Sequence, residues 1–233
     1  SPQCYWDVEL DRAPSGGGDS ESVREELRER LRGAVERRLI SDVPLGAFLS
    51  GGIDSSAVVA MMRDLEMNSI LTCSIGFREK RYDESRYADM VAQAKATDHR
   101  SEIVEATDYG LLEKLVGLYD EPYADSSAIP TYRVCELARK HVTVALSGDG
   151  GDENFIGYRR YGLFSMEERL RSMLPYSVRK PIFGALGRWY PKLDWAPRVF
   201  RGKTTFEALA RDSMRAYLHG VSIFSQDNRE RLY

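Results

Sequence analysis

The feature that most constrains the fold of this chain is an alternation of two hydrophobic periods between residues 44 and 148. Short apolar runs that read as strands alternate with segments in which apolar residues recur at helical spacing. The expected strands are 44–50, 69–77, 100–105 and 142–148, and the expected helices are 55–65, 84–96, 109–119 and 126–141. Parallel strands need such helices as crossover connections, so the pattern predicts an α/β fold with a mostly parallel, twisted sheet and helices on both faces.

Outside the alternating region, the chain divides into parts of different character. Residues 1–21 read as an interdomain tail and linker, because residues 13–22 have the sequence APSGGGDSES. Residues 22–160 form the predicted α/β core. Residues 161–233, which are Arg-rich and punctuated by Trp and Pro, form a helical part that we expect to be truncated. The chain is therefore expected to be a piece of a longer protein.

A further helix is predicted in front of the first strand. Ser22 and Glu25 have the spacing of a capping box. Five apolar residues then recur at helical spacing, namely Val23, Leu27, Leu31, Val35 and Leu39. Together these signals predict an amphipathic helix from Ser22 to about Ile40.

Composition argues against several classes of protein. The formal net charge of −3 gives no general attraction to nucleic acid or to an anionic membrane, so any anion site must be local. No apolar run approaches the roughly 20 residues that cross a bilayer, and no signal segment opens the chain. The three cysteines, Cys4, Cys73 and Cys135, lack the spacing of a disulfide framework or a zinc site. We therefore expect a cytoplasmic protein that binds neither nucleic acid nor membrane.

Two glycine-rich loops stand where ligands bind in open α/β sheets, directly after a strand. The first is FLSGGIDSS, residues 48–56, and the second is LSGDGGDE, residues 146–153. In the first loop, glycines allow close approach, backbone N–H groups and the start of the next helix attract an anion, and serine hydroxyls can donate hydrogen bonds. The loop carries no Lys and does not match the phosphate loop of kinases and GTPases. An anion site of another kind is therefore predicted.

Asp54 conflicts with a simple anion site, because its carboxylate would repel a phosphate. The second loop supplies another carboxylate, Asp152, at the same edge of the predicted sheet. If both carboxylates bind one Mg²⁺, the ion cancels their charge and bridges to phosphate oxygens. The alternative is that both loops are tight turns in which Asp54 and Asp152 only cap helices.

The motifs resemble a known family. LSGGIDSS looks like the PP-loop of the ATP pyrophosphatases. Together with YDESRYA, DEPYADSSAIPTY and LSGDGGDENFIGYRRY, it resembles the synthetase domain of glutamine-dependent asparagine synthetases. The likeness covers Tyr5 to about Tyr161. It is specific for the ATP chemistry and less so for the acceptor, because beta-lactam synthetases and peptide-cyclising relatives share these loops.

The resemblance implies that a carboxylate attacks the α-phosphate of ATP, releasing pyrophosphate, and that ammonia captures the acyl-adenylate. The resemblance also implies the fold of the PP-loop ATP pyrophosphatases, with ATP and Mg²⁺ as cofactors. The implied pyrophosphate contacts are Ser50, Gly51, Gly52, Ser55 and Ser56, and the implied metal ligands are Asp54 and Asp152. The implied nucleoside contacts are the backbone groups of Leu49, Ile75 and Gly148, and the implied catalytic residues are Ser147 and Asp149. Asp149 stands where many relatives have glutamate.

The acid to be activated is expected to be aspartate, which would give beta-aspartyl-AMP and then asparagine. Ammonia would come from an N-terminal glutaminase domain that is missing from this chain. One alternative is a related enzyme that adenylates a sugar, peptide or beta-lactam precursor, and another is a nucleotide-binding domain without turnover. The sequence leaves open whether the protein forms a homodimer.

Other residues fit ordinary structural roles. His99, His141 and His219 are scattered and lack the spacing of a metal site. The arginines between residues 159 and 215 read as a solvated helical face, because acids are interleaved with them. Met61, Met62, Trp189 and Trp195 read as packing residues. Asp120 and Glu121 have either a substrate role or a turn role.

Overall fold

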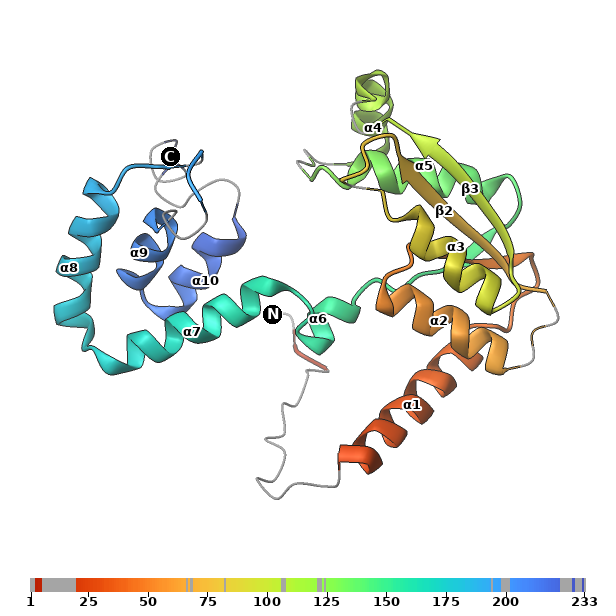
Figure 1. Ribbon diagram of the computed structural model, residues 1–233, viewed down its shortest axis with the longest axis horizontal. Coiled ribbons are helices and arrows are strands. Elements are labelled where there is room, and N and C mark those ends of the chain that lie inside the picture. Colours follow the sequence, from red (N-terminus) through yellow and green to blue (C-terminus); the bar gives the residue numbers. More distant parts are fainter. Residues whose placement is uncertain are drawn as a thin grey trace. The chain divides into compact units, whose positions relative to one another are not determined.

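The structure is a computed structural model that describes residues 3–5, 20–65, 67, 69–81, 83–105, 108–120, 123, 125–193, 195–197, 202–222, 228 and 232. The chain forms two compact units, Ser1–Asp149 and Gly150–Tyr233, and each is described by itself (Figure 1). The second glycine-rich loop crosses the boundary between them. The predicted linker lies almost entirely outside the described residues, and the predicted division into 1–21, 22–160 and 161–233 stays a prediction.

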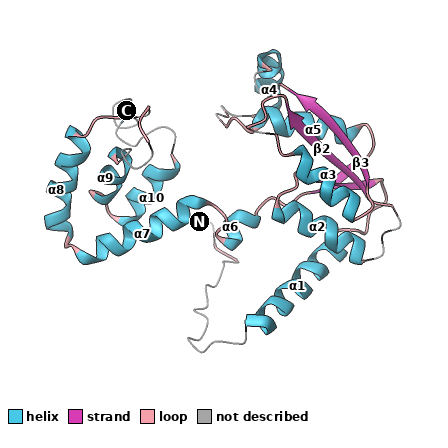
Figure 2. Cartoon of the chain, in the orientation of Figure 1, coloured by secondary structure: helices cyan, strands magenta, loops and turns pink. Residues whose placement is uncertain are grey.

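The first unit is built on a four-stranded sheet (Figure 2). Its strands are β1 (Leu45–Phe48), β2 (Leu71–Phe77), β3 (Asp98–Val104) and β4 (Val144–Leu146). Their spatial order is β3-β2-β1-β4, and all three neighbouring pairs are parallel. The predicted parallel α/β sheet is confirmed. Because β2 and β4 lie on opposite sides of β1, the carboxyl ends of β1 and β4 form the switch point of the sheet.

Helices cover both faces of this sheet. The helices of the unit are α1 (Ser20–Glu36), α2 (Ile53–Asp64), α3 (Ser85–Ala94), η1 (Tyr109–Leu111), α4 (Leu112–Leu118) and α5 (Ala128–Arg139). Ala47 of β1 and Leu49, which directly follows this strand, pack with α2 and α3, whereas Phe48 of β1 packs with α5. Successive side chains of a strand point to opposite faces, so α2 and α3 lie on one face and α5 on the other.

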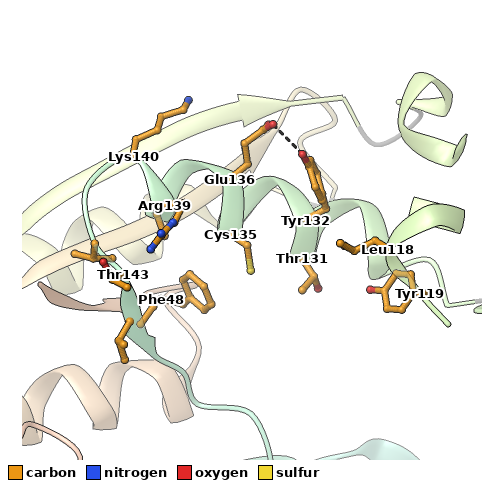
Figure 3. A pocket seen from close by; sticks show the side chains of 14 residues that line it. Phe48, Leu118, Tyr119, Thr131, Tyr132, Cys135, Glu136, Arg139, Lys140 and Thr143 are labelled. Atoms are coloured by element: carbon orange, nitrogen blue, oxygen red, sulfur yellow. Dashed lines mark hydrogen bonds between the residues drawn. The ribbon is translucent and has the colours of Figure 1, made fainter. Parts of the chain in front are cut away.

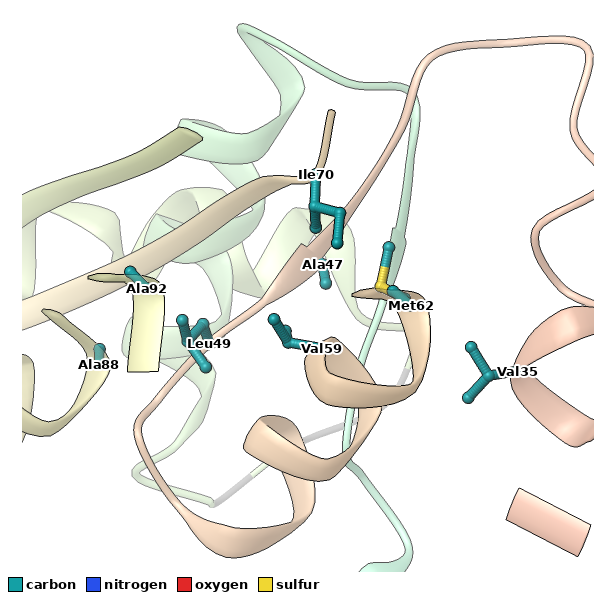
Figure 4. Close-up of a cluster of buried hydrophobic side chains, with 8 residues drawn as sticks. All are labelled: Val35, Ala47, Leu49, Val59, Met62, Ile70, Ala88 and Ala92. Carbon is teal, nitrogen blue, oxygen red and sulfur yellow. The ribbon is translucent and has the colours of Figure 1, made fainter. Parts of the chain in front are cut away.

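The larger core cluster fixes α2 and α3 against β1 (Figure 4). Its buried members are Val35, Ala47, Leu49, Val59, Met62, Ile70, Ala88 and Ala92. Val59 and Met62 on α2 are completely buried, and burial of such a side chain contributes about 1.5 to 3 kcal/mol. Met61 packs against the same cluster, so the packing roles predicted for Met61 and Met62 are confirmed. The cluster thereby holds the loop that joins β1 to α2.

The helix at the start of the core differs from its prediction. α1 spans Ser20–Glu36, so Ser22 lies inside the helix and is not its N-cap. After Glu36 the chain tightens into a turn in which the backbone N–H of Leu39 donates to the carbonyl of Glu36 (3.1 Å). Val35 is buried, but Val23 is 57% exposed because α1 reaches the core through its last turns only. The capping-box reading is therefore wrong.

The second unit is helical, as the sequence predicts. Its helices are α6 (Gly151–Phe155), α7 (Arg159–Met173), α8 (Tyr176–Trp189), α9 (Lys203–Leu209) and α10 (Ser213–Val221). Arg171 and Arg179 are buried, and their guanidinium groups donate to carbonyls at the end of α9, those of Ala208 and Leu209. These two arginines are thus not part of a solvated face, because their buried guanidinium groups bind carbonyls at the end of a helix, where positive charge is favourable. None of the helices within the described residues is long and apolar enough to cross a membrane.

The tryptophans of the second unit are also not where the sequence predicted them. Trp189 and Trp195 are 85% and 84% exposed. Trp189 is the last residue of α8, whose buried face consists of other residues, such as Arg179 and Gly187. The prediction that Trp189 and Trp195 are packing residues is wrong for this chain.

Candidate functional site

The loop between β1 and α2 has a defined internal structure. Gly51 has a φ of +83°, a conformation that side chains other than that of glycine rarely adopt. The Ser55 hydroxyl is buried and closes the loop: it accepts from the backbone N–H of Ser50 (3.3 Å), lies 3.0 Å from the Ser50 hydroxyl and donates to the carbonyl of Gly52 (3.2 Å). The Ser50 hydroxyl in turn accepts from the N–H of Gly52 (3.2 Å). The loop is therefore held in one shape before any ligand binds.

The start of α2 leaves backbone donors facing away from the helix. Gly52 is the N-cap residue, and the N–H of Ser56 donates to its carbonyl (3.0 Å). The N–H groups of the three residues in front of Ser56 have no acceptor inside the helix, because they precede its first turn of hydrogen bonds. Asp54 is the second residue of α2, and the helix has no side-chain cap. The alternative that Asp54 only caps this helix is therefore wrong.

The second glycine-rich loop lies directly against the first. A Cβ atom added to Gly148 would be 2.6 Å from the backbone nitrogen of Ser55 and 2.8 Å from the carbonyl carbon of Asp54. Only a glycine fits this approach. Next to it, the N–H of Asp149 donates to the Ser147 hydroxyl (3.0 Å). Within the first unit, the two loops thus meet at the switch point of the sheet, as parallel strands ending at one edge require.

The rest of the second loop belongs to the second unit. Gly150 has a φ of +90° and is the N-cap of α6, which has no side-chain cap. Asp152 is the second residue of α6, so it is not a cap either. Its carboxylate lies against the Cα of Gly157, where a side chain would not fit. The structure therefore brings together the predicted site residues of the first unit and describes Asp152 separately.

Ile75 lies beyond the end of its neighbouring strand. The last paired residue of β1 is Phe48, opposite Cys73, and the N–H of Leu49 donates to the carbonyl of Cys73 (2.9 Å). Backbone groups alternate in direction along a strand, so those of Ile75 point to the same side as those of Cys73. At Ile75, β1 has already ended. Its N–H and carbonyl are therefore directed at the space beside the first glycine-rich loop.

The hydroxyl of Ser56 is another feature of this region. Its oxygen is buried and has no hydrogen-bond partner among the residues that the structure describes. A buried hydroxyl without a partner costs free energy that a bound polar ligand or water would recover. Ser56 stands in the first turns of α2, four residues after the N-cap.

The motif YDESRYA has a structural role that the sequence does not reveal. The Asp83 carboxylate accepts from the backbone N–H of Phe77 (3.4 Å) and from the N–H and hydroxyl of Ser85 (3.2 and 3.1 Å). The hydrogen bonds from Ser85 hold the pKa of Asp83 below its ordinary value. This turn ties the end of β2 to the start of α3. In consequence, a Cβ on Gly51 would lie 2.5 Å from the Tyr87 Cβ and from the Ala88 nitrogen.

His99 forms a buried polar group with two hydroxyls of β2. Its ring nitrogens Nδ1 and Nε2 lie 2.8 and 3.1 Å from the hydroxyls of Thr72 and Ser74, both buried. Burial lowers the pKa of His99, although Asp89, at 3.7 Å, acts in the opposite direction. His99 is thus a core residue that joins two strands, as expected of an ordinary histidine. Within the described parts of the chain, no group of three or more His, Cys, Asp or Glu residues could hold a metal ion.

A pocket of about 800 Å³ lies on the α5 face of the sheet (Figure 3). Phe48 of β1, Tyr119 at the end of α4 and Cys135 of α5 are among its lining residues, and the Tyr132 hydroxyl donates to Glu136 at its rim (3.1 Å). None of the predicted site residues lines it. Of the two acids left open between helices, Asp120 is exposed in a bend, and Glu121 lies outside the described residues.

The fold and the loops define a class of protein: a parallel α/β protein with a strand-end glycine loop that leads into a helix at the switch point of its sheet. The family model for asparagine synthase matches residues 26–231. The chain belongs to the asparagine synthase family, which confirms the resemblance drawn from its motifs.

Relatives of known name agree with this assignment. The chain is 49% identical over 142 residues to a putative glutamine-hydrolyzing asparagine synthetase of Methanocaldococcus jannaschii, a match that covers 60% of this chain and 27% of that protein. It is 32% identical over 215 residues to the glutamine-hydrolyzing asparagine synthetase 1 of Bacillus subtilis, covering 92% of this chain and 33% of that protein. A solved NH3-dependent NAD synthetase of Campylobacter jejuni is 12% identical, with a TM-score of 0.38 and coverage of 88% of this chain and 98% of that one. The chain spans a third or less of the length of the two curated relatives.

Proposed function

We propose that the protein forms an amide bond by adenylating a carboxylate with ATP. The carboxylate oxygen attacks the α-phosphorus, the bond to the β-phosphate oxygen breaks, and pyrophosphate leaves. Ammonia then attacks the acyl carbon, AMP leaves with the bonding electrons, and the nitrogen loses a proton to give the amide. The observation that carries this proposal is the approach of Gly148 to Asp54 and Ser55, which joins two glycine-rich loops at the switch point.

Residues of the first loop are proposed to hold the pyrophosphate. These residues are Ser50, Gly51, Gly52, Ser55 and Ser56. The helix start directs N–H groups and partial positive charge at this place, and the buried Ser56 hydroxyl is a donor without a partner in the described structure. Ser55 has a different role in pyrophosphate binding, because its hydroxyl already makes the hydrogen bonds that hold the loop closed. Its contribution is to position the N–H groups.

The nucleoside is proposed to lie across the ends of β1, β2 and β4. Leu49 and Ile75 would offer backbone groups to the base, and Gly148 would allow the ribose to approach. Support comes from the direction of the Ile75 backbone, which faces the space beyond β1. Ser147 and Asp149 follow β4 directly and are proposed to contact the α-phosphate and the activated acid. Such a site accelerates the reaction by positioning and charge stabilisation and needs no protein nucleophile.

Asp54 and Asp152 are proposed to bind Mg²⁺. Both are second residues of helices that lack side-chain caps, so neither carboxylate is used as a cap. Carboxylate oxygens together with phosphate oxygens form the usual ligand set of Mg²⁺ in proteins. When bound, the ion supplies positive charge that neutralises the phosphates and the leaving group. The protein residues contribute by holding the two carboxylates on helix starts next to the glycine loops.

Aspartate is proposed as the acid and a glutaminase domain as the source of ammonia, because the two curated relatives described above are named as glutamine-hydrolyzing asparagine synthetases. The cytoplasmic location and the homodimer stay predictions. A related reaction on another carboxylate is the second candidate, since most of the proposed contacts are with the nucleotide and only Ser147 and Asp149 are proposed to reach the acid.

The test is exchange of radiolabelled pyrophosphate into ATP with a panel of acids, in the presence of Mg²⁺. The proposal expects exchange that depends on an added carboxylate, with aspartate giving the strongest signal. Strong exchange with another acid and none with aspartate would move the assignment to the second candidate. ATP binding without exchange for any acid would contradict the proposed adenylation and indicate a domain that binds nucleotide without turnover.

A further inference from the structure

The two glycine-rich loops contain no positively charged side chain. The parts of these loops in the first unit, residues 48–56 and 146–149, have no Lys or Arg, but they carry Asp54 and Asp149. A triphosphate or pyrophosphate adds several negative charges to these two. One divalent cation cannot balance the total, so further positive charge has to come from segments that adjoin the loops. This reasoning rests on the proposed function.

The connection between β2 and α3 adjoins the first loop. β2 ends at Phe77 on the same edge of the sheet as β1, because the two strands are parallel. The first turn of α3 touches the loop, since a Cβ on Gly51 would lie 2.5 Å from both the Tyr87 Cβ and the Ala88 nitrogen. Figure 4 shows Ala88 of α3 close to Leu49, the residue that leads into the loop. The hydrogen bonds of Asp83 fix this connection in place.

This connection carries four basic residues and three acidic ones. Residues 78–86 read REKRYDESR. Arg78 forms an ion pair with Glu105 (3.7 Å), and the Asp83 carboxylate accepts hydrogen bonds from Ser85 and Phe77. Lys80 and Arg86 are exposed, and neither makes a hydrogen bond or ion pair with another residue that the structure describes. Both side chains are thus available for a ligand.

The position of Arg86 favours a role at the loop. It is the second residue of α3, directly before the residue that contacts Gly51. Side chains of a helix tilt toward its N-terminus, and α3 begins at the edge of the sheet where the glycine loops lie. A guanidinium group at this place can reach past the helix start and donate two hydrogen bonds to phosphate oxygens.

We propose that Lys80 and Arg86 bind the terminal phosphates of ATP and the departing pyrophosphate, so that the β2–α3 connection forms a third wall of the phosphate site. Arg86 donates to non-bridging phosphate oxygens, and Lys80 contributes a mobile charge from the exposed connection. Both cations stabilise the charge that develops on pyrophosphate as it leaves. The alternative is that both side chains serve only to keep the surface hydrated.

The test is calorimetric titration of the protein with inorganic pyrophosphate and with ATP, each in the presence of Mg²⁺. Lys80→Gln and Arg86→Gln each weaken pyrophosphate binding about tenfold, the scale of one lost charge-assisted hydrogen bond. The double variant loses about a hundredfold if the two sites act independently. Arg86→Lys keeps the charge but loses the paired hydrogen-bond geometry of the guanidinium group, so it recovers only part of the affinity. Thermal unfolding is unchanged in all variants, since both side chains are exposed.

Lys95→Gln is the matched control. Lys95 follows the other end of α3, at the opposite edge of the sheet, and its loss changes the net charge equally. Equal affinities of wild type, Lys80→Gln and Arg86→Gln would overturn the inference while leaving the proposed function intact. An equal loss in Lys95→Gln would also overturn it, because it would show a general charge effect. If wild type bound neither ligand, both the inference and the proposed function would be wrong.

Discussion

Replacement of Gly51 by alanine tests the geometry of the phosphate loop most sharply. Gly51 has a φ of +83° and lies against the start of α3. An alanine Cβ would be 2.5 Å from the Ala88 nitrogen and 2.6 Å from the Tyr87 carbonyl carbon. Both are backbone atoms, so they cannot move aside as the end of a flexible side chain can. Gly51→Ala should therefore force the loop and α3 apart.

The magnitude follows from two terms. A left-handed backbone costs a residue with a Cβ about 1 to 2 kcal/mol. Overpacking against backbone costs about 1 to 3 kcal/mol more. The free energy of unfolding should fall by about 2 to 5 kcal/mol, which is a large part of the total for a domain. For a chain of this size, the melting temperature should fall by about 2 to 4 °C for each kcal/mol.

Gly52→Ala is the control for this prediction. Gly52 has an ordinary φ of −67°, and the nearest atom to an added Cβ is the Ser50 hydroxyl oxygen at 3.3 Å. Its cost should stay below about 1 kcal/mol. Urea unfolding followed by circular dichroism measures both variants, and a Gly51→Ala protein as stable as Gly52→Ala would refute the packing of α3 on the loop.

Three further predictions concern single side chains. Asp54→Asn should leave the melting temperature unchanged, because Asp54 is not a cap, and should lower the rate of pyrophosphate exchange by a factor on the order of 10² or more. A fully active variant would exclude a metal-ligand role for Asp54. Ser55→Ala removes the acceptor of the Ser50 N–H and should lower the free energy of unfolding, measured with urea, by about 1 to 3 kcal/mol. An unchanged urea midpoint would show that the Ser55 hydroxyl does not hold the loop. Burial lowers the pKa of His99 below its ordinary value of about 6.5, so the stabilisation by His99 is complete above that pH and is lost as the pH falls below it. His99→Gln should flatten this part of the stability–pH curve, and an equally steep curve in the variant would refute the assignment.

The sheet was predictable because its strands carry local signals. Each of the four apolar runs overlaps one of the observed strands, and each helical segment between them overlaps a helix, although β3 and α2 each begin two residues before the predicted range. The ends were less predictable. The run 142–148 contains a strand of three residues, Val144–Leu146, because pairing with β1 extends no further. The prediction of a capping box at Ser22 and Glu25 failed because Ser20 is already helical.

Burial in the second unit could not be read from the helical pattern. Arg171 also pairs with two glutamates at helical spacing in α7, but the carbonyls of Ala208 and Leu209, which accept from Arg171 and Arg179, are 30 or more residues away in the chain. Sequence spacing within α7 or α8 contains no information about such a partner. The exposure of Trp189 likewise depends on which neighbours reach the end of α8.

The candidate site was predictable in part, because its two loops also carry local sequence signals. Glycines and acids after a strand mark the two loops, and parallel topology places both at one edge. The contact of Gly148 with Ser55, by contrast, joins residues more than 90 positions apart. The role of Asp83 in placing α3 against Gly51 also needs three-dimensional proximity. The motif YDESRYA contains Asp83, but nothing in the motif indicates that α3 packs against Gly51.

The most direct test of the central claim, that the two glycine-rich loops hold ATP together with Mg²⁺, is calorimetric titration of ATP into the protein with Mg²⁺ and with excess EDTA. The account predicts clear binding with Mg²⁺ and binding at least tenfold weaker without it, because Asp54 then repels the phosphates without a bridging ion. Equal affinity in both conditions, or no binding with Mg²⁺, would contradict the account.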